Sequence, residues 1–486
     1  MRCSARVGIG TAEDITSSGA ATSAREAETM TTFEHRSHVD ASVREVFAWH
    51  RRPGAFERLA PPWENMRVVE RGGGIVEGGR VVIELRKGPL ALRWLAVHTD
   101  YQEDRQFVDV QLHGPFSHWR HVHRFVPDDG GCALEDHVEY RIPLGRPGDF
   151  LLGASVRRTL ERAFHYRHER TRRDLARHQA VARYGPQRVV VSGASGLIGR
   201  NLVAFLESGG HSAQRLVRRR PRAEANEVYW DPASGAIDGA ALEGADVVVH
   251  MAGENVGAGL WTLARKEAIL RSRVDGTTLL CKTLSGLTRR PRVLVAASAV
   301  GYYGDRGDDL LTEESAPGND FLAHVVQAWE SATEPARQAG IRVVNLRIGF
   351  ALSAAGGGLP RLLLPFRFGL GGIAGSGRQY MSWIAFDDLI GVFHHAMFAD
   401  GLSGPVNVAA PCPVTNADLS KALGRVLHRP VFLPLPAFAV RLAAGEMGEA
   451  LLLSGQRISS AKLERSGFRF LHTDLKDALR GELGLD

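Results

Sequence analysis

The chain has 486 residues, 44% of them hydrophobic, and a formal net charge of +6. This length accommodates roughly three domains of about 150 residues, and the composition is typical of a globular protein with buried cores. No stretch reaches the roughly 18 uninterrupted apolar residues of a membrane-spanning helix. The most apolar segments, such as residues 431–444, are interrupted by prolines and by Arg441, so we expect no membrane span.

The N-terminal segment and the cysteines bear on the compartment. Residues 1–30 are rich in Ala, Ser, Thr and Gly and lack the apolar core of a secretory signal, so we expect a disordered tail, with Met1 and Met30 as alternative starts. The cysteines lie far apart without a CxxC pair, which predicts neither a disulfide framework nor a zinc site. A cytoplasmic location is the simplest interpretation. The four cysteines are Cys3, Cys132, Cys281 and Cys412.

Many of the positive charges lie between residues 157 and 183. Apolar residues recur there at helical spacing, and Glu161, Glu169 and Asp174 lie among the arginines. A solvated helix face explains this pattern better than a nucleic-acid surface, which would also offer an aromatic platform. We therefore expect no nucleic-acid partner.

The first folded region begins near residue 32. Residues 33–39 predict a strand, and Asp40 fits the N-cap position of a following helical segment. Segments that alternate apolar and polar residues come next, separated by turn residues such as those at 127–131. A long helix from about 148 to 183 ends the region. We expect these strands to form a curved antiparallel sheet that packs on this helix, because such packing buries the apolar face of each strand.

This element order and the segment ASVREVFAWHRRPGAFERLAPPW resemble the helix-grip, START-like (SRPBCC-type) ligand-binding proteins, which include polyketide cyclases and lipid carriers. The resemblance implies a cavity that takes an apolar ligand. Trp94, Phe116 and Trp119 are the candidates to line it, and a filled core is the alternative, because alternation alone does not distinguish a packed sheet from a hollow one.

A glycine-rich turn follows at residues 188–199, which read RVVVSGASGLIG and run from an apolar strand into a helix. Gly193 permits a tight turn, Gly196 lets the backbone approach a pyrophosphate, and Gly199 lets helix and strand pack closely. The phosphates would lie at the helix N-terminus. The pattern predicts a Rossmann fold that binds a nicotinamide dinucleotide.

The end of the next strand bears on the choice of cofactor. An acidic residue there would accept from the ribose 2′-hydroxyl of NAD, but the sequence has Arg218, Arg219 and Arg220, which suit a 2′-phosphate. NADP(H) is therefore favoured over NAD(H), with a solvated strand end as the alternative. The residues expected to bind the cofactor are Gly193, Ser195, Gly196, Leu197, Ile198, Gly199, Arg218, Arg219, Met251, Ala252, Gly253 and Arg273.

The fold class that follows is α/β and α+β, with a Rossmann domain after a START-like one. A Gly-Pro linker at 184–187 separates patterns typical of the two. We expect the two halves, about 30–183 and 187–486, each to fold alone. The expected parts are a tail (1–30), a START-like domain (31–183), a Rossmann domain (187–410) and a C-terminal substrate-side region (411–486).

The second half resembles the extended and atypical short-chain dehydrogenase/reductases, specifically the epimerase-family proteins described as predicted sugar-nucleotide epimerases. The resemblance runs from about residue 188 to the C-terminus and implies a Rossmann core with a small cap on the substrate side. It is carried by the motifs VSGASGLIG, HMAGENV, SRVDGTTLL, ASAVGYYGDRGD, LPFRFGLGG, GSGRQYMSWI and LLLSGQR.

The sequence departs from the family at its catalytic residues. Active members use Ser, Tyr and Lys, and the lysine lowers the pKa of the tyrosine for proton exchange. Ser298 occupies the serine position, but Leu322 and Val326 stand where Tyr and Lys are expected, and Arg273 replaces an asparagine. We therefore expect cofactor binding without the usual Tyr/Lys mechanism.

Other side chains are candidates for the proton chemistry. Tyr302 and Glu254 are the candidate acids or bases beside Ser298, with Lys266 as a further one, and a packed aromatic, a helix-start carboxylate and a surface charge are the respective alternatives. His121 and His123 alternate along one strand, without a third ligand at metal spacing, so no metal site is expected.

Two functions remain open on the sequence. One is an NADP-dependent oxidoreductase or epimerase-like enzyme acting on a small molecule. The other is a non-catalytic NADPH-binding sensor or scaffold whose START-like domain holds an apolar ligand. Retention of Ser298 and of the C-terminal region favours the enzyme, whereas loss of Tyr and Lys favours the sensor.

Overall fold

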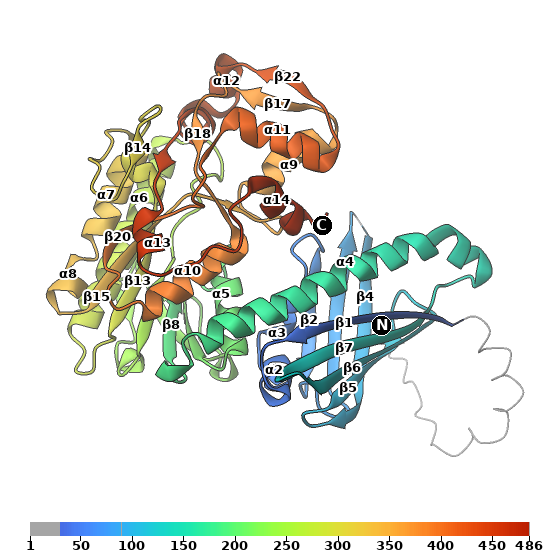
Figure 1. The fold of residues 1–486 in the computed structure, drawn as a ribbon. Coiled ribbons are helices and arrows are strands. Elements are labelled where there is room, and N and C mark those ends of the chain that lie inside the picture. Colours follow the sequence, from blue (N-terminus) through green and yellow to red (C-terminus); the bar gives the residue numbers. More distant parts are fainter. Residues whose placement is uncertain (1–29, 89, 486) are drawn as a thin grey trace, which may run out of the picture. The chain divides into compact units, whose positions relative to one another are not determined.

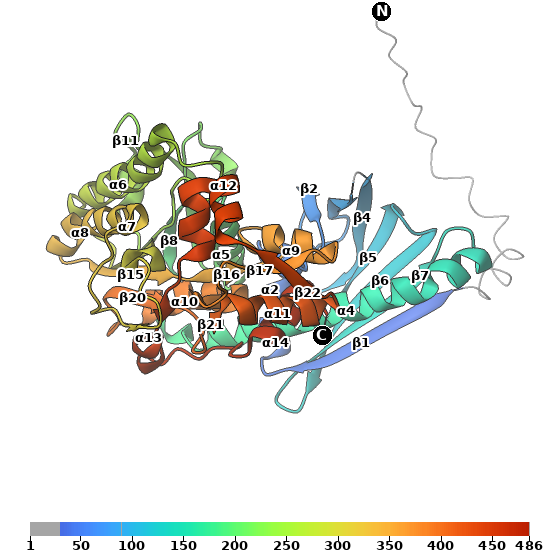
Figure 2. The same ribbon diagram turned by 90° about the horizontal axis from the view of Figure 1, so that it is seen from above.

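The computed structural model describes residues 30–88 and 90–485, so the predicted tail and Cys3 lie outside the described residues. Its contacts divide the chain into two compact units. Among the described residues, the first contains those of 30–43 and 66–165, and the second contains those of 44–65 and 166–485. The long helix α4 (Arg146–Gln179) contributes to both units (Figures 1 and 2).

The first unit is a seven-stranded antiparallel sheet in the order β1-β7-β6-β5-β4-β3-β2, so the first and last strands are neighbours. Asp129 and Gly130 form the two-residue turn between β6 and β7, both with positive φ, as the sequence predicted for this segment. The strands are β1 (Thr31–Val39), β2 (Met66–Gly72), β3 (Arg80–Lys87), β4 (Leu90–Gln102), β5 (Gln106–His113), β6 (His118–Asp128) and β7 (Gly131–Arg141).

The part of α4 in this unit packs on the sheet. Leu160 and Phe164, one helical turn apart, are buried against side chains of β1, β6 and β7. The predicted arrangement of a sheet on one long amphipathic helix is therefore confirmed. The buried residues of this core are Phe33, Trp119, Val138, Tyr140, Ile142, Leu160 and Phe164.

The second unit contains an eight-stranded sheet in the order β11-β10-β9-β8-β12-β13-β15-β20. The strands from β10 to β20 in this order run parallel to one another, and β11 pairs antiparallel with β10 at one edge. The strands are β8 (Arg188–Ser192), β9 (Ser212–Val217), β10 (Glu227–Asp231), β11 (Ala236–Ile237), β12 (Val247–His250), β13 (Val293–Ala299), β15 (Arg342–Ile348) and β20 (Gly404–Val408).

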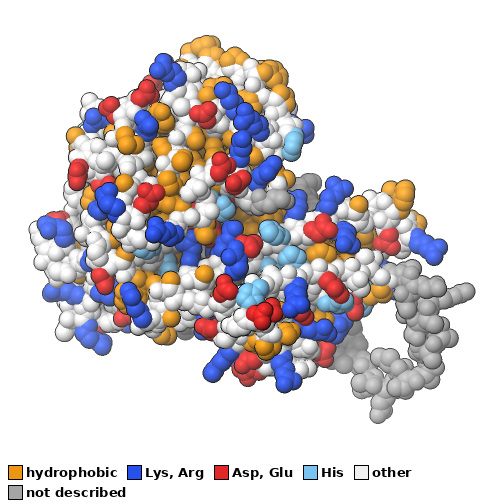
Figure 3. Space-filling model, viewed as in Figure 1, with side chains coloured by type: hydrophobic (Ala, Val, Ile, Leu, Met, Phe, Trp, Pro, Cys, Tyr) orange, Lys and Arg blue, Asp and Glu red, His pale blue; other side chains and the backbone are white. Residues whose placement is uncertain are grey.

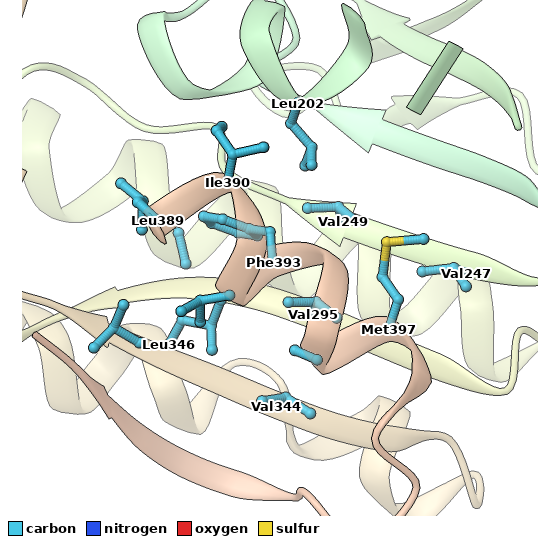
Figure 4. Close-up of a cluster of buried hydrophobic side chains, with 14 of the residues drawn as sticks. Leu202, Val247, Val249, Val295, Val344, Leu346, Leu389, Ile390, Phe393 and Met397 are labelled. Atoms are coloured by element: carbon cyan, nitrogen blue, oxygen red, sulfur yellow. The ribbon is translucent and has the colours of Figure 1, made fainter. Parts of the chain in front are cut away.

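Helices cover both faces of this sheet, which explains why its central strands read as continuous apolar runs. On one face, α5 (Leu197–Ser208) and α10 (Phe386–Phe398) bury Val249, Val295 and Leu346 beneath Phe393 (Figure 4). On the other face, α6 (Leu263–Ser285) and α8 (Glu334–Gln338) cover a second cluster. Strand order, connections and cover are those of the predicted Rossmann fold.

A smaller region built from four two-stranded sheets and several helices surrounds a third buried cluster. Phe432, Phe438 and Leu442 leave an exposed apolar surface over β22 and α12 (Figure 3). The strand pairs are β14 (Leu310–Leu311) with β23 (Arg457–Ile458), β16 (Phe350–Leu352) with β19 (Trp383–Ala385), β17 (Gly371–Ala374) with β22 (Val431–Leu435), and β18 (Tyr380–Met381) with β21 (Val414–Thr415). The remaining helices are α7 (Phe321–Ser331), α9 (Leu359–Arg367), α11 (Asn416–Leu427), α12 (Ala437–Gly448), α13 (Ala461–Arg465) and α14 (Leu475–Leu483).

Buried charges join three sequence-distant parts of the second unit. Arg58 donates two hydrogen bonds of 2.7 Å to the carboxylate of Asp174, and one of 3.3 Å to Asp387, which also pairs with Arg170. Arg58 and Asp174 are 3% and 0% exposed, so the pair is desolvated. These residues come from α3 (Ala55–Leu59), α4 and α10; α2 (Val43–Arg51) precedes α3.

Across residues 30–88 and 90–485, no helix has both the length and the apolar character needed to cross a membrane.

Candidate functional site

The glycine turn follows β8, next to the strand β12, where the order of the strands reverses. Gly193 has φ 69°, and a Cβ atom added to it would lie 2.8 Å from the carbonyl carbon of Met251. At Gly199 a Cβ would lie 2.2 Å from the Gly193 carbonyl oxygen. Two of the three glycines are therefore required by the close packing of the turn against β12 and α5, as the sequence predicted.

Gly196 has a different environment. A Cβ atom there would meet only the Gly193 carbonyl oxygen, at 3.3 Å, so its outer side is open. Gly196 is also the N-cap of α5 and supplies no capping side chain. Ser195 and Gly196 are exposed, whereas Leu197 and Ile198 are half-buried on the core. An open glycine at an uncapped helix start leaves amide groups to receive a phosphate, so these residues fit a dinucleotide.

A buried polar chain holds the turn after β12 against the turn after β8. Thr277 donates its hydroxyl to a backbone carbonyl of its own helix, α6, and therefore accepts from Nε2 of His250 at 2.9 Å. Nδ1 of His250 then accepts from Ser192 at 2.7 Å, and the Ser192 oxygen accepts from the amides of residues 251 and 252. Burial lowers the pKa of His250 to about 4, so the ring is neutral. The sequence analysis quoted the motifs that contain these three side chains but assigned none of them a role, because their hydrogen bonds to one another depend on the fold.

The predicted arginines after β9 have different partners. Arg219 and Arg222 both donate to the carboxylate of Glu227, and these hydrogen bonds, Arg219 first, lower the pKa of Glu227 to about 2 despite its desolvation. Arg218 is exposed at the end of β9, without a hydrogen bond to another described side chain. Of the three predicted arginines, Arg219 is therefore tied to an acid, whereas Arg218 and Arg220 are exposed, and their contact with a phosphate stays a prediction.

Arg273 lies under the turn formed by residues 251–254. Its guanidinium donates to the carbonyl oxygens of Glu254 and Ile269, at 3.0 and 3.1 Å, and stacks over the ring of Trp329. A Cβ atom on Gly253 would lie 3.3 Å from that guanidinium. Burial lowers the pKa of Arg273 to about 10. Arg273 thus stabilises the turn through these contacts. Its contact with the cofactor stays a prediction.

Ser298 belongs to a buried polar network. Its hydroxyl donates to Oε1 of Glu330 at 2.6 Å, and Arg347 donates two hydrogen bonds of 2.8 Å to the same carboxylate. Arg347 also donates to the hydroxyl of Tyr303, which donates to Asn407 at 2.7 Å. Burial raises the pKa of Tyr303 to about 12, so its phenol stays protonated.

Tyr302 joins the same network through its ring. The guanidinium of Arg347 lies 3.4 Å from the ring centroid of Tyr302. Ser298 and Tyr302 are thus brought together, as the sequence analysis expected. Leu322, at the position of the family tyrosine, packs its Cβ near Gly301, and Val326 is buried. Glu330 lies one helical turn beyond Val326 on α7, so a carboxylate reaches the serine from the helix that lacks both Tyr and Lys.

The other proton candidates have other partners. The carboxylate of Glu254 pairs with Arg265 at 3.1 Å. Lys266 pairs with Glu446 of α12 and lies over the ring of Phe321. Neither joins the network around Ser298. The sequence analysis missed Glu330 and Arg347. The sequence shows only an acidic residue in the helix where YxxxK is expected and a basic residue in the strand that comes after that helix.

In the first unit, Trp94, Phe116 and Trp119 lie together as expected, with ring centroids 4.9 to 5.7 Å apart. They pack on one another, and whether they also line a ligand cavity stays a prediction. A hollow of about 500 Å³ in this unit is lined by other residues, including the sequence neighbours of Trp94 and Phe116. It is lined by Glu84, Ala91, Leu92, Arg93, His113, Gly114 and Pro115.

Comparison with protein families gives three matches along the chain. Residues 39–165 match polyketide cyclase / dehydrase and lipid transport proteins, and residues 189–409 match the NAD dependent epimerase/dehydratase family. Residues 435–481 match a domain of unknown function. The first unit is therefore a START-like domain, as the sequence predicted.

The chain's relatives match it over most of their own length. The epimerase family protein Mb2239 of Mycobacterium bovis is 44% identical over 291 residues, which are 60% of this chain and 96% of the relative. The epimerase family protein YfhF of Bacillus subtilis is 37% identical over 295 residues, which are 60% of this chain and 96% of that relative.

Solved structures give the same result. A nucleoside-diphosphate sugar epimerase from Corynebacterium glutamicum has a TM-score of 0.78 and 36% identity, covering 93% of this chain and 90% of that one. Human epimerase family protein SDR39U1 (isoform 2), solved with NADPH, has a TM-score of 0.56 and 32% identity, covering 61% and 99%. The present chain therefore belongs to the epimerase family of NAD(P)-binding, short-chain dehydrogenase/reductase-type proteins.

Proposed function

We propose that this protein is an NADP-dependent oxidoreductase or epimerase-like enzyme in which a Ser298–Glu330 pair, rather than Tyr and Lys, moves the proton. The supporting observation is the 2.6 Å hydrogen bond from Ser298 to a carboxylate that Arg347 neutralises. The bound cofactor would supply or accept a hydride. When a substrate alcohol is oxidised, its hydroxyl proton passes to Oγ of Ser298 while the Ser298 proton passes to Oε1 of Glu330. Reduction reverses both transfers.

Tyr302 is the second group of this proposal. Its ring is held by the Arg347 guanidinium, so its position is coupled to that of Glu330. We assign to Tyr302 the positioning of the substrate oxygen next to Ser298. Phenylalanine at this position would keep the stacking and remove the hydroxyl.

The test uses NADPH deuterated at the transferable position. The full chain is incubated with it and with nucleoside-diphosphate sugars or a metabolite extract, and products are searched for a mass gain of one deuterium. The name of the Corynebacterium glutamicum relative motivates the choice of sugars. We expect labelled product from the wild type, and a rate lower by roughly 100-fold or more with Glu330→Gln, within the usual range for acid–base catalysis. Unchanged turnover in this variant would refute the proton pathway.

For the cofactor we propose a preference for NADPH that depends on Arg218. The human relative was solved with NADPH, and Arg218 lacks the carboxylate partner that occupies Arg219. NADPH should bind at least about ten-fold more tightly than NADH, or about 1.4 kcal/mol. Arg218→Ala should abolish that ratio, whereas Arg222→Ala, which removes another arginine of the same segment, should preserve it. Equal affinities in the wild type would contradict the preference.

A non-catalytic NADPH sensor is the second candidate, and Leu322 and Val326 in place of Tyr and Lys favour it. The two functions differ in one outcome. A sensor binds NADPH without transferring deuterium to any product and without converting any sugar into its epimer, even at high protein concentration. The same labelling experiment therefore separates them.

For the START-like unit we propose a small apolar ligand. The match to lipid transport proteins and the aromatic group at Trp94, Phe116 and Trp119 support it. Displacement of a fluorescent fatty acid from the full chain tests it, with Trp119→Ala expected to weaken binding. If no apolar molecule binds and this variant only lowers stability, the aromatic group is a filled core.

A further inference from the structure

Five buried or half-buried polar side chains meet on one face of the sheet in the START-like unit. The strand register places His98 opposite Asp109 and Asp109 opposite His121. Two residues beyond His121 on β6, His123 lies opposite Asp136 of β7. Directly paired residues share a face of the sheet, so four neighbouring strands bring three imidazoles and two carboxylates together. His121 also contacts the ring of Phe164, which places the group on the face covered by α4.

The two carboxylates lie on opposite sides of two imidazole rings. Oδ1 of Asp136 lies 2.8 Å from Nε2 of His121 and 2.6 Å from Nδ1 of His123. Oδ2 of Asp109 lies 3.9 Å from Nδ1 of His121 and 3.2 Å from Nε2 of His123. Asp136 thus pairs with Nε2 of His121 and with Nδ1 of His123. The second ring nitrogen of each histidine, Nδ1 of His121 and Nε2 of His123, faces Asp109.

We propose that Nδ1 of His121, Nε2 of His123 and Oδ2 of Asp109 bind one divalent first-row transition-metal ion of the Zn²⁺ or Fe²⁺ type. Metal–ligand bonds of about 2.0–2.2 Å place neighbouring ligand atoms roughly 3.0–3.5 Å apart. The measured pairs, 3.2 and 3.9 Å, need only a small adjustment. All three ligand atoms lie within 4.8 Å of one another. Two imidazoles and one carboxylate leave positions for water or a substrate.

The surroundings of the three ligands match those of metal sites. Ligating histidines usually donate their second N–H to a carboxylate, which fixes the tautomer and turns the free nitrogen toward the ion. Asp136 does this for both rings. His98 holds the other oxygen of Asp109 at 2.5 Å, which orients that carboxylate. Each ligand therefore already has an outer partner.

The local charge also suits a cation. Two carboxylates lie within 3.2 Å of these imidazoles, Asp136 beside both rings and Asp109 beside His123. A divalent cation bound between the rings and Asp109 would therefore have two carboxylates around it.

A second group of three histidines, His178, His211 and His394 in the Rossmann unit, fits a metal less well. Nδ1 of His211 accepts from the amide of Gln187 at 3.0 Å, so its Nε2 carries the proton. No carboxylate of the residues that the structure describes joins the group, and Arg52 lies near His211. These rings serve as the comparison in the test.

The experiment titrates the full chain, stripped with a chelator, with Co²⁺ and then with Zn²⁺. We expect one Co²⁺ per chain with visible absorption bands that Zn²⁺ removes. His121→Ala and Asp109→Asn should weaken binding by roughly 100-fold or more, and Asp136→Asn by about 10- to 100-fold. His137→Ala alters the neighbouring histidine of β7, which pairs with Glu34 and Glu139, and should leave affinity unchanged.

Circular dichroism confirms that each variant folds. If a variant fails to fold, X-ray absorption of the Zn²⁺-loaded wild type decides, with two imidazoles and a carboxylate expected around the ion. Absence of Co²⁺ and Zn²⁺ binding by the wild type, or binding that His121→Ala leaves intact and His211→Ala abolishes, overturns the proposal.

Discussion

At the scale of single residues, the three glycines of the turn have unequal requirements. Gly199→Ala would place a methyl group 2.2 Å from a backbone oxygen and 2.8 Å from the Cα of Ala194, so α5 must shift. We expect a loss of roughly 1–3 kcal/mol of unfolding free energy, as for other overpacked sites, and weaker NADPH binding. Urea unfolding and cofactor fluorescence measure the two effects.

Gly196→Ala is the matched variant. Its methyl group would meet one oxygen at 3.3 Å, so we expect nearly normal unfolding but reduced NADPH affinity, because the Cβ occupies the side open to the phosphates. The pair of variants separates packing from binding. Normal NADPH affinity in Gly196→Ala would mean that the cofactor does not approach this turn.

Glu482 in α14 gives a prediction about pH. Burial raises the pKa of Glu482 from 4.5 to about 8. Between these values the folded chain holds a proton that the unfolded chain has lost, so stability falls as pH rises from about 4.5 to about 8. Glu482→Gln should remove this slope and stabilise the protein at pH 8 by up to roughly 4 kcal/mol.

Thermal unfolding at several pH values checks this prediction. Asp477→Asn, an exposed carboxylate on the same helix, is the control and should keep the wild-type slope. A variant and wild type that lose stability in parallel between pH 5 and 8 would show that Glu482 ionises normally.

The candidate site was predictable only in part, for a physical reason. The glycines act on their own backbone, so a local motif reveals them, and Ser298 lies in a recognisable apolar strand. Glu330 of α7 and Arg347 of β15 form a hydrogen bond only because the fold places their elements side by side. The hydrogen bond from Arg219 to Glu227 likewise depends on the fold. Side chains of common types that act through distant partners leave no spacing to detect.

At the scale of elements, α3, α4 and α10 depend on a desolvated ion pair. Asp174→Ala would leave the Arg58 guanidinium buried with only its longer contact to Asp387. Breaking such a pair costs about 3–5 kcal/mol, because a charge remains in the interior. We expect a loss of this size in urea unfolding monitored by circular dichroism.

Arg172→Ala is the control for this prediction. Arg172 lies on the same helix and pairs with Glu169, but both are solvent-accessible, so less than about 1 kcal/mol should be lost. Similar losses in both variants would mean that the buried pair is no stronger than a surface one.

The sequence predicted β8 and α4 well, because β8 is a continuous apolar run and α4 carries a helical pattern over 34 residues. The two-residue strands of the cap, such as β14 and β18, are too short for any pattern and form only where their partners meet. The sequence analysis considered His121 and His123 but expected no metal site, because it found no third ligand, and Asp109 was missed for a related reason. Asp109 and His123 belong to different strands, and the register that brings them together is set by hairpins rather than by sequence spacing.

At the scale of the molecule, the family matches lie one after another along the chain, but the compact units do not. Residues Arg44–Asn65 belong to the second unit, although the START-like match spans 39–165. Asp387 of α10 pairs with Arg58 and Arg170, which both precede the linker at 184–187 in the sequence. The Rossmann unit is thus completed by segments that precede its own first strand.

This interlacing leads to a prediction about fragments 30–183 and 187–486, which the sequence predicts to fold alone. In 187–486, the buried carboxylates Asp387 and Asp388 lose Arg58, Arg170 and Arg177. Unpaired buried charges are costly, so we expect this fragment to unfold cooperatively but at a lower temperature than the same transition in the full chain. Differential scanning calorimetry of both fragments and the full chain measures this. Asp387→Asn together with Asp388→Asn in the 187–486 fragment should recover part of the loss, because neutral amides cost less to bury without cations. An equal transition temperature in fragment and full chain would show that the preceding segments contribute nothing to the stability of the Rossmann unit.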